Sequence, residues 1–318
     1  MPSPLISALR AYVRHAPPAL AHAPLIRYLD QALARGPRTT IARTRDGDLT
    51  AVTTSDLIQR FLYLHGVWEP HLTAWIRGRL APGDTFIDVG AHTGYYTLLA
   101  SRLVGAAGSV VAIEASPAFH AILEEALRRN ACHNVRTANV AAADTTRTLT
   151  LYLQDEANLG NTSAVQPRTS HSSFQVDARP LPEILHPEEL ATARLIKIDV
   201  EGAEASLMKG LAPTLGHLRA DAELVIEVTP RSLSKQGQSV HDVLDPLRAH
   251  GFHTYRIAND YDPTSYPSAV RRPAAPVRWD GPITEMSDIV FSRIDADHLG
   301  GSAPSTTGSQ AADHPSSP

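Results

Sequence analysis

From Pro82 to residue 293, short apolar runs alternate with longer segments in which apolar positions recur every three or four residues. The short runs predict strands, and the longer segments predict amphipathic helices. We expect strands at residues 85–89, 109–114, 135–140, 195–200, 223–228, 253–258 and 287–293. Helices are expected at residues 93–103, 117–130, 203–211 and 239–250. This alternation is typical of a doubly wound α/β domain, which we place at residues 81–295.

The segments outside this alternation predict additions to the domain. Residues 1–80 indicate helices and a hairpin at 43–53, and we interpret them as an N-terminal extension that forms a lid or substrate region. Residues 148–154 and 174–178 indicate an inserted hairpin. The loop between them, residues 155–173, either supplies ligand contacts or is a plain turn; its candidate contact residues are Asn161, Thr162 and Ser163.

Two further segments have no helical or strand period. Residues 259–280, rich in Pro, Tyr and Arg, predict an excursion between the last two strands. Residues 296–318 contain mostly Gly, Ser, Thr, Ala and Pro, so we expect a disordered tail.

Composition argues against several classes of binding partner and site. The formal net charge of −4 provides no basic face for nucleic acid or for an anionic membrane. The single cysteine, Cys132, excludes a disulfide framework and a cysteine zinc cluster, and we interpret it as an inert, partly buried thiol. No apolar run approaches the ~18 residues of a membrane span, and no clean signal peptide is present, so we expect a cytoplasmic protein. Formation of a homo-oligomer stays open.

The turn after the first strand of the α/β domain predicts a nucleotide site. An apolar strand runs into Asp88, then Gly90 and Gly94, then an apolar helix. Glycines at such a junction let the backbone approach a ligand closely. Dinucleotide folds require G-x-G-x-x-G, whereas the spacing here is D-x-G-x-x-x-G, with His92 inside the turn. A turn this bulky suits a ligand without a pyrophosphate, and S-adenosylmethionine is the first candidate.

Three side chains near this turn have two interpretations each. Glu114, at the end of the second strand, either accepts the ribose hydroxyls of a nucleoside or is a solvated strand-end residue. Asp88 either lies near the methionine end of the ligand or holds the turn by accepting backbone N–H groups. His92 either packs on the ligand or acts as a general base, because its ordinary pKa is near neutrality.

Carboxylates gather after the fourth and fifth strands. Asp199, Glu201 and Glu204 follow one strand, and Glu227 ends the next. All four are expected at the sheet edge where open α/β folds bind ligands. We interpret Asp199, Glu227 and Glu201 as catalytic, either as base and substrate anchors or as oxygen ligands of Mg²⁺. Glu201 and Glu204 also suit a helix N-terminus without any catalytic role.

Several of these motifs occur together in one known family. The matching segments are Trp68-Glu69-Pro70, residues 82–97, Ile113-Glu114-Ala115-Ser116-Pro117, Asn139-Val140-Ala141, Lys197-Ile198-Asp199-Val200-Glu201-Gly202-Ala203-Glu204, and Glu227. With these segments the chain resembles the FkbM-type methyltransferases, a class I S-adenosylmethionine-dependent family. The resemblance implies a seven-stranded mixed, Rossmann-like sheet with helices on both faces. In such a sheet the seventh strand runs antiparallel between the fifth and sixth.

The resemblance also implies an activity and a set of contacts. The activity is O-methylation of a hydroxyl on a small molecule, such as a polyketide, sugar or other secondary metabolite of the kind made in antibiotic biosynthesis. Cofactor contacts are implied for Glu69, Asp88, Gly90, His92, Gly94, Tyr95, Glu114, Ala115, Asn139, Ala141 and Asp199. The chain departs from the family pattern at three places: His92 replaces a common Asn, Ala115 replaces a frequent Pro, and residues 180–183 replace Leu-Asp-Asp.

The sequence also leaves other functions as alternatives. A nicotinamide-dependent oxidoreductase with a degenerate Rossmann turn is one, and a non-catalytic S-adenosylmethionine-binding module is another. A nucleic-acid methyltransferase is disfavoured, because no basic face is visible. Several aromatic residues either wall an acceptor pocket or belong to the core: Tyr63, Trp68, Trp75, Tyr261, Tyr266 and Trp279.

Overall fold

The computed structural model describes residues 4–15, 23–153, 162–163 and 172–300. The candidate contact Asn161 and residues 301–318 of the expected tail lie outside this range. The first residues of that tail, 296–300, pack on the domain instead, since Leu299 is 1% exposed and His298 pairs with Val277. The helices are α1 (Pro4–His15), α2 (Ala23–Arg35), α3 (Leu57–His65), α4 (Pro70–Arg79), α5 (Tyr95–Val104), α6 (Pro117–Arg129), α7 (Leu181–Ile184), α8 (Pro187–Thr192), α9 (Glu204–Leu211), α10 (Pro230–Lys235), α11 (Val240–Ala249) and α12 (Tyr266–Arg271). A 3₁₀ helix, Ala212–His217, follows α9.

The strands form sheets of eight, four and two strands. The strands are β1 (Thr39–Arg43), β2 (Leu49–Thr53), β3 (Thr85–Val89), β4 (Ser109–Ile113), β5 (Val135–Ala138), β6 (Ala141–Ala142), β7 (Arg147–Leu153), β8 (Thr162–Ser163), β9 (Ser172–Arg179), β10 (Ala193–Ile198), β11 (Glu223–Val228), β12 (His253–Ile257), β13 (Val277–Arg278) and β14 (Ser287–Ser292).

The large sheet has the predicted mixed topology. Its order is β13-β12-β14-β11-β10-β3-β4-β5. β14 pairs antiparallel with both β11 and β12, so the last long strand lies between the fifth and sixth strands of the domain. This confirms the predicted class I methyltransferase architecture. The short strand β13 adds an eighth strand at the edge.

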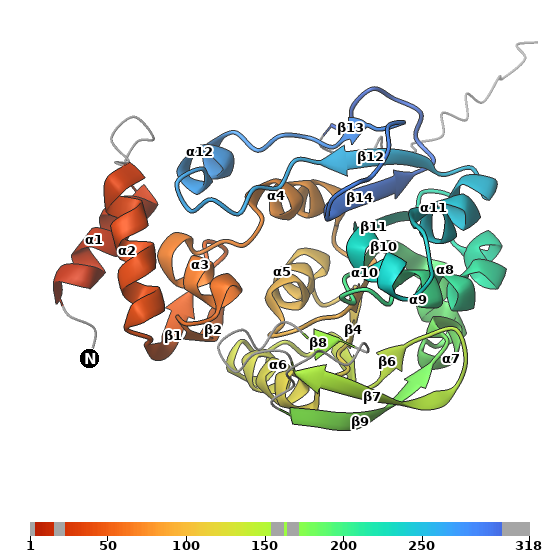
Figure 1. The fold of residues 1–318 in the computed structure, drawn as a ribbon, viewed down its shortest axis with the longest axis horizontal. Helices are drawn as coiled ribbons and strands as arrows, with labels where there is room; N and C mark the ends of the chain where they lie inside the picture. The colour runs from red at the N-terminus through yellow and green to blue at the C-terminus, as the bar shows by residue number, and fades with distance from the viewer. Residues whose placement is uncertain (1–3, 16–22, 154–161, 164–171, 301–318) are drawn as a thin grey trace, which may run out of the picture.

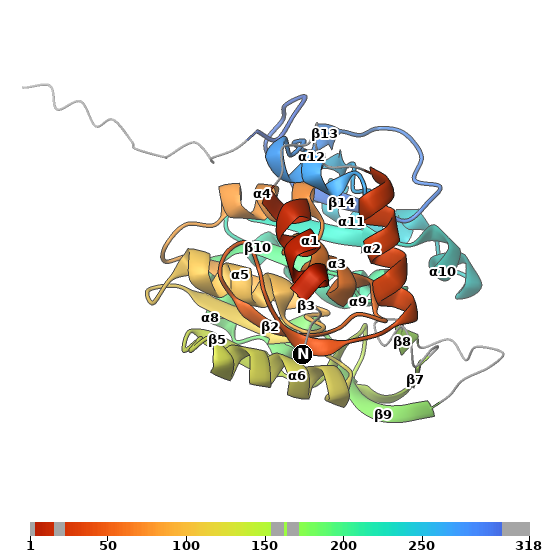
Figure 2. The same ribbon diagram turned by 90° about the vertical axis from the view of Figure 1, so that its left-hand side faces the viewer.

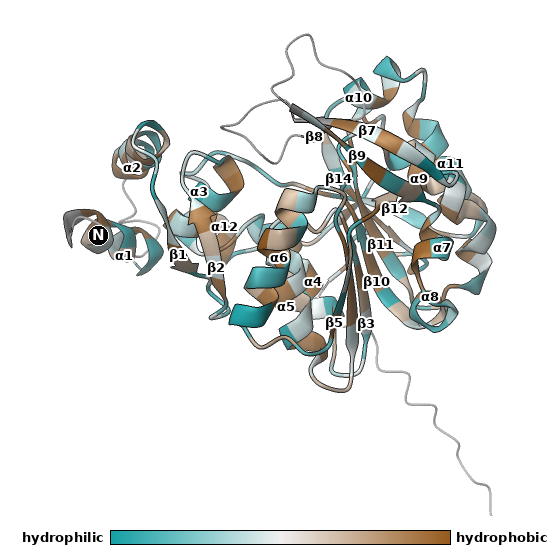
Figure 3. Cartoon of the chain, turned by 90° about the horizontal axis from the view of Figure 1, so that it is seen from below, coloured by the Kyte–Doolittle hydropathy of each residue, from teal (hydrophilic) through white to brown (hydrophobic). Residues whose placement is uncertain are grey.

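Helices cover both faces of this sheet, as Figure 3 shows from below with α4, α5 and α6 on one side and α7, α8, α9 and α11 on the other. The strands are buried on both faces, and β3 and β10 are buried at every position. The apolar side chains therefore divide into two cores. One contains Phe86 and Tyr255 with the N-terminal helices, and the other contains Ile87 and Ile196 with α9 and α11.

The N-terminal region consists of helices and one hairpin, as predicted. β1 and β2 pair antiparallel through a turn at Gly47, which has a φ of 96°. Asp56 begins α3 by accepting a hydrogen bond from the Gln59 N–H at 2.9 Å. Figures 1 and 2 show α1 and α2 beyond α3, at the end of the molecule.

Two local predictions differ from the structure. The third strand was expected to reach residue 140, but β5 ends at Ala138, and Ala141–Ala142 pair instead with β9 in the four-stranded sheet. The 259–280 excursion contains α12 and β13, although its sequence has no helical period. A helix of six residues with a proline in its first turn is too short to show such a period. The inserted hairpin is present as β7 paired with β9.

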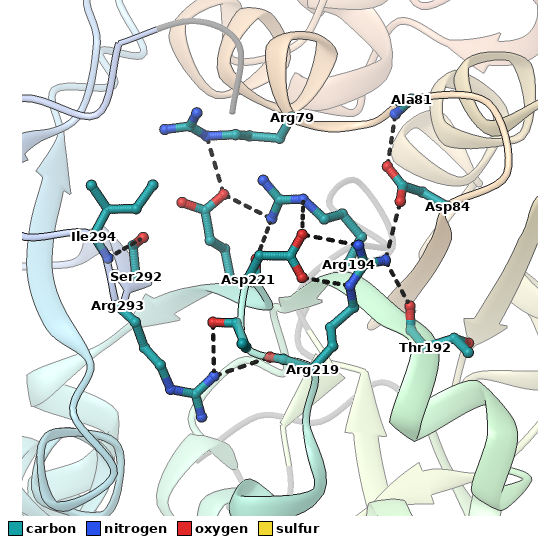
Figure 4. Close-up of polar contacts among 12 residues, drawn as sticks. Arg79, Ala81, Asp84, Thr192, Arg194, Arg219, Asp221, Ser292, Arg293 and Ile294 are labelled. Atoms are coloured by element: carbon teal, nitrogen blue, oxygen red, sulfur yellow. Dashed lines mark hydrogen bonds and ion pairs between the residues drawn. The ribbon is translucent and has the colours of Figure 1, made fainter. Parts of the chain in front are cut away.

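Buried charges join the N-terminal region to the amino edge of the sheet (Figure 4). Arg79, at the end of α4, lies 3.1 Å from Glu223 Oε2, and Arg194 lies 3.0 Å from the same oxygen. These three side chains are at most 4% exposed. Removing one member of such a set leaves an uncompensated buried charge, which is strongly destabilising.

Among the described residues, no helix has both the length and the apolar character that crossing a membrane requires. Cys132 is half-buried, and burial raises the pKa of its thiol. The partial burial of Cys132 agrees with the prediction from the sequence.

Candidate active site

The glycine turn lies against the end of a neighbouring strand. Gly90 follows β3 with a φ of 83°, and a Cβ placed on it would lie 1.8 Å from the backbone oxygen of Asp199. No other residue type fits this contact, because both the space and the left-handed conformation require glycine. Gly94, with a φ of 88°, begins α5 against the side chain of Leu123.

Glu114 follows β4 and reaches across this turn. Its carboxylate accepts hydrogen bonds from the His92 N–H at 2.7 Å and the Ser116 N–H at 2.8 Å. Burial raises the pKa of Glu114 to about 7, although both backbone donors oppose the shift. The side chain is therefore held at the mouth of the turn, where the sequence predicted a ribose-binding acid. Asn139 donates to the backbone oxygens of Glu114 and Ala115 at 2.8 and 3.1 Å, so it supports this segment from behind.

His92 is half-buried in the turn and packs on an aromatic ring. Its φ of 51° is left-handed, and its ring centroid lies 4.1 Å from that of Phe119. Burial lowers the pKa of His92 to about 4, so the imidazole is neutral near pH 7. Among the described residues its Nε2 has no hydrogen-bond partner. This arrangement suits packing or hydrogen bonding with a ligand better than general-base catalysis.

These residues line a cavity at the carboxyl edge of the sheet. Its apolar wall is formed mainly by side chains from four segments: Ile58, Ile113, Ala115, Phe119, Val140, Ala141, Leu149 and Leu151. Glu114 lines the same cavity, as do Asp199 and Glu201. The contributions from α3 and β7 were not predicted, because nothing in an apolar residue of a helix or hairpin indicates which cavity it faces.

Asp88 and Tyr95 were also predicted to contact the cofactor, but neither side chain lines this cavity. Asp88 accepts a hydrogen bond from the Thr97 hydroxyl at 2.6 Å, while its Oδ1 has no partner among the described residues. Burial raises the pKa of Asp88. Tyr95 is buried and shares a 3.0 Å hydrogen bond with Thr73, so it acts within the core.

A lysine lies at the centre of the carboxylates. Lys197 Nζ donates to Asp199 Oδ2 at 2.9 Å and lies 5.0 Å from the ring centroid of Tyr96. Burial alone would lower the pKa of Lys197, but Asp199, Asp88 and Glu69 raise it above its ordinary value. Sequence reasoning missed this residue. The available signal was a lysine inside an otherwise apolar, fully buried strand.

Two sets of three carboxylates share Glu227. Oxygens of Asp199, Glu201 and Glu227 lie within 4.8 Å of one another, as do oxygens of Glu69, Glu227 and Asp288. The first set is the predicted catalytic group. Asp288, from β14, was not predicted, because a single acid in a late apolar strand has no local motif. Either set offers the oxygen ligands that a divalent cation prefers.

Burial and mutual repulsion raise the pKa values of these acids. Burial raises the pKa of Glu69 to about 8 and that of Asp288 to about 6. Partial desolvation and the charge of Asp199 raise the pKa of Glu201, although this residue is exposed at the surface. Burial and the charge of Asp199 raise the pKa of Glu227 well above its ordinary value. Perturbed acids gathered at a ligand-binding edge are characteristic of functional sites.

Glu204 has a structural position instead. It accepts a hydrogen bond from the Gly202 N–H at 2.7 Å and begins α9, and its Oε2 has no partner among the described residues. Glu204 therefore holds the turn that presents Glu201, whose φ of 50° is left-handed. Strain of this kind costs about 1–2 kcal/mol and persists where the surrounding contacts require it.

Glu69 joins the N-terminal region to the excursion before β14. It accepts hydrogen bonds from the Tyr96 hydroxyl at 2.6 Å and the Tyr261 hydroxyl at 2.9 Å. The ring of Tyr261 stacks on Trp68 at a centroid distance of 5.3 Å. Glu69 has a φ of 40° directly before Pro70, a strained conformation that places its carboxylate among the other acids.

A second cavity, of about 460 Å³, begins at Glu227 and Asp288. Tyr261 and Trp279 form its aromatic sides, and Asn259 donates to Asp288 at 2.6 Å within it. Of the six aromatic residues considered from the sequence, Trp68, Tyr261 and Trp279 lie at the site. Tyr63, Trp75 and Tyr266 are buried in the core, where Tyr266 packs on Phe61 at 4.7 Å.

The apolar cavity fits an adenosine-bearing ligand. Its walls are apolar, Glu114 offers carboxylate oxygens at one side, and Gly90 leaves no side chain between the turn and the ligand space. Asp199 lines this cavity and belongs to the acid set that contains Glu227. The ligand cavity and the carboxylates therefore meet at Asp199 and Glu201.

Comparisons with known proteins agree with this geometry. A family model described as the methyltransferase FkbM domain matches residues 88–254. A protein-L-isoaspartate O-methyltransferase from Caenorhabditis elegans is 32% identical over 89 residues, which cover 27% of this chain and 40% of that protein. The chain thus spans less than half the length of that relative.

Solved structures with a similar fold include two methyltransferases. A methyltransferase FkbM from Methylobacillus flagellatus is 15% identical with a TM-score of 0.38, over 91% of this chain and 58% of that one. An S-adenosylmethionine-dependent O-methyltransferase from Thermotoga maritima is 14% identical with a TM-score of 0.39, over 84% of this chain and 82% of that one.

Proposed function

Because the chain belongs to the FkbM methyltransferase family, we propose that it transfers a methyl group from S-adenosylmethionine to a hydroxyl of a small molecule, such as a secondary metabolite. The observation that carries this proposal is the position of Asp199, which borders both the apolar cavity beside Glu114 and the acid set with Glu227. Family membership favours this activity over the nicotinamide-dependent alternative.

The residues of the apolar cavity would hold the cofactor. Glu114 would accept the ribose hydroxyls, and Phe119, Ala115 and Ala141 would contact the adenine. Asp88 would face the methionine end. When bound, S-adenosylmethionine supplies a methyl group on a positively charged sulfur, which is open to in-line attack by an oxygen nucleophile.

Asp199 would orient the acceptor hydroxyl and take its proton. S-adenosylmethionine would supply the methyl group and would keep the electron pair of the broken carbon–sulfur bond on sulfur, while Asp199 would accept the proton that the hydroxyl loses as its oxygen binds the methyl carbon. Deprotonation has to accompany attack, because the pKa of an alcohol lies far above that of any carboxylate. Lys197, 2.9 Å from Asp199, keeps one carboxylate oxygen in place.

The acceptor would occupy the cavity beside Glu227 and Asp288. Its aromatic sides, Tyr261 and Trp279, suit an organic ring, while Asn259 and Asp288 suit hydroxyl groups. An anionic acceptor is disfavoured, because Glu227 and Asp288 line this cavity and its lining cation, Arg256, is paired with Glu285 at 2.6 Å. We therefore propose an uncharged or cationic acceptor.

Calorimetric titration with S-adenosylmethionine and NADH tests the cofactor assignment, with Glu114→Gln as the variant. We expect wild type to bind S-adenosylmethionine and not NADH, and the variant to lose about 1–3 kcal/mol of binding free energy. Glu188→Gln, exposed on α8, is the matched control and should leave affinity unchanged. Equal affinity in wild type and Glu114→Gln would contradict the assignment.

The reaction itself is tested by methyl transfer from labelled S-adenosylmethionine to a panel of hydroxyl and amine acceptors, with and without Mg²⁺. Label on an oxygen supports the proposal, and label only on nitrogen overturns it. A rate that requires Mg²⁺ would assign the acid sets a metal-binding role, and a rate indifferent to it would leave proton removal to Asp199.

A further inference from the structure

A cavity of about 250 Å³ lies on the N-terminal side of the molecule, away from the carboxylates, and its polar lining is cationic. Arg14 contributes from α1, Arg45 from the turn between β1 and β2, and Arg271 from the end of α12. Val13, Pro267 and Val270 form its apolar lining. Three segments distant in sequence therefore present guanidinium groups to one space.

Backbone carbonyls engage these arginines. Arg14 donates to the carbonyls of Leu62, Tyr63 and Leu64 at 2.8, 2.7 and 3.0 Å, at the end of α3. Arg45 donates to the carbonyls of His65 and Arg14, both at 2.9 Å. Within the described residues, neither Arg14 nor Arg45 has a carboxylate partner.

The negative ends of helix dipoles offset only part of the positive charge of these arginines. The carboxyl ends of α1, α3 and α12 meet here, and each carries the equivalent of about −0.5 charge. The ends of α1 and α3 together oppose about −1 to the two charges of Arg14 and Arg45, and Arg10 stacks on Tyr63 nearby. A positive excess remains in a chain whose formal net charge is −4.

The positive field lowers the pKa values of the neighbouring cationic groups. Burial, Arg10 and Arg45 lower the pKa of Arg14 to about 10. Burial and Arg271 lower the pKa of Arg45. Behind them, burial together with Arg14 and Arg45 lowers the pKa of His65 to about 3. Each cation would be stabilised by an anion in the cavity.

We propose that this cavity binds a phosphate-bearing small molecule. Arg45 has guanidinium N–H groups beyond the two hydrogen bonds above, and these would bind phosphate oxygens together with Arg271. A bound diphosphate would join α1, the β1–β2 turn and α12. The excursion that contains α12 also carries Tyr261, so occupancy would hold the acceptor side of the site to the N-terminal helices (Figure 1).

Calorimetric titration of the full chain with pyrophosphate, and separately with inorganic phosphate, tests the proposal. We expect one pyrophosphate per chain, bound more tightly than phosphate and with a raised melting temperature. Arg271→Glu and Arg45→Glu should each weaken binding by at least about tenfold, the loss expected for a charge-assisted hydrogen bond. Arg271→Lys should stay closer to wild type.

Arg272→Glu is the matched control, because it makes the same charge change at an exposed neighbour that does not line the cavity. Melting curves without ligand establish that each variant folds, and Arg271→Glu should fold because its side chain is exposed. Absence of pyrophosphate binding to wild type overturns the proposal. Equal weakening by Arg272→Glu and Arg271→Glu overturns it as well, since the attraction would then be general.

Discussion

The hydroxyl of Tyr261 donates to Glu69 at 2.9 Å across a separation of 192 residues. This contact joins the segment before α4 to the excursion before β14, and the ring of Tyr261 stacks on Trp68 beside it. A carboxylate with two phenolic donors is fixed in orientation. This part of the candidate site is therefore assembled from segments far apart in the chain.

Replacing Tyr261 with Phe should destabilise the protein by about 1–3 kcal/mol, because the buried Glu69 loses one of its two hydroxyl donors. The aromatic ring and its packing on Trp68 remain. Urea denaturation measures the change. Tyr28→Phe, at a residue that is 66% exposed, is the control and should alter stability by less than about 0.5 kcal/mol. Equal effects of the two substitutions would show that the Glu69 contact contributes nothing.

Replacing Asp199 with Asn should lower kcat by at least about 100-fold, because the variant cannot take the acceptor proton. The side chain keeps its size, so S-adenosylmethionine affinity should stay near that of wild type. The measurement pairs steady-state kinetics, using the acceptor found in the panel, with calorimetry. Asp177→Asn, at a residue with a 67% exposed side chain, should leave both quantities unchanged. Normal turnover in Asp199→Asn would exclude it as the base.

Replacing Gly90 with Ala should cost at least about 3 kcal/mol or prevent folding, since the new methyl would overlap the backbone oxygen of Asp199. Gly83→Ala separates steric overlap from conformational strain. Gly83 also has a positive φ, of 91°, but a Cβ there meets nothing within 4 Å. That variant should lose only about 1–2 kcal/mol. Similar unfolding free energies for both variants would mean that the close approach to Asp199 is unimportant.

Between pH 6.5 and 8 the ligand-free protein should lose stability as the pH rises. Burial raises the pKa of Glu69 to about 8, so the folded state binds more protons than the unfolded state in this window. The lowered pKa values of His65 and His92, about 3 and 4, favour the folded state as the pH rises, but that effect is complete by about pH 6.5.

Unfolding free energies measured across that window, with Glu69→Gln as the comparison, test the assignment. The variant removes one titrating group and should show a shallower decline. A wild-type stability that is flat or rises from pH 6.5 to 8 would show that Glu69 is not held protonated.

The sequence predicted the sheet well because each strand is a short apolar run with a turn signal at its end, as at Asp88-Val89-Gly90. It located Glu114, Asp199 and Glu227 because each follows such a run at the ligand-binding edge. Whether these residues act as predicted stays to be tested. Asp288 and Lys197 were missed because their role depends on pairing between strands far apart in the chain.

Local patterns do not show which tertiary contacts a side chain makes. Glu204 matches the family motif as well as Glu201 does, and in the structure it accepts from the Gly202 N–H and holds a turn. Asn139 was predicted to contact the cofactor, and its amide donates to the backbone oxygens of Glu114 and Ala115. No spacing rule distinguishes a carboxylate or amide that touches a ligand from one that supports the loop beside it.

The ion pair between Arg79 and Glu223 limits how far the chain can be truncated from its N-terminus. The family domain matches from residue 88, but Arg79 precedes it, and so does Glu69. A fragment that begins at the recognised domain would lack Arg79, so Glu223 would have fewer buried counter-charges. It would also lack Glu69, which belongs to the acid set with Glu227 and Asp288. The smallest unit that can be inherited, recombined or expressed intact is therefore longer than the unit that sequence similarity outlines.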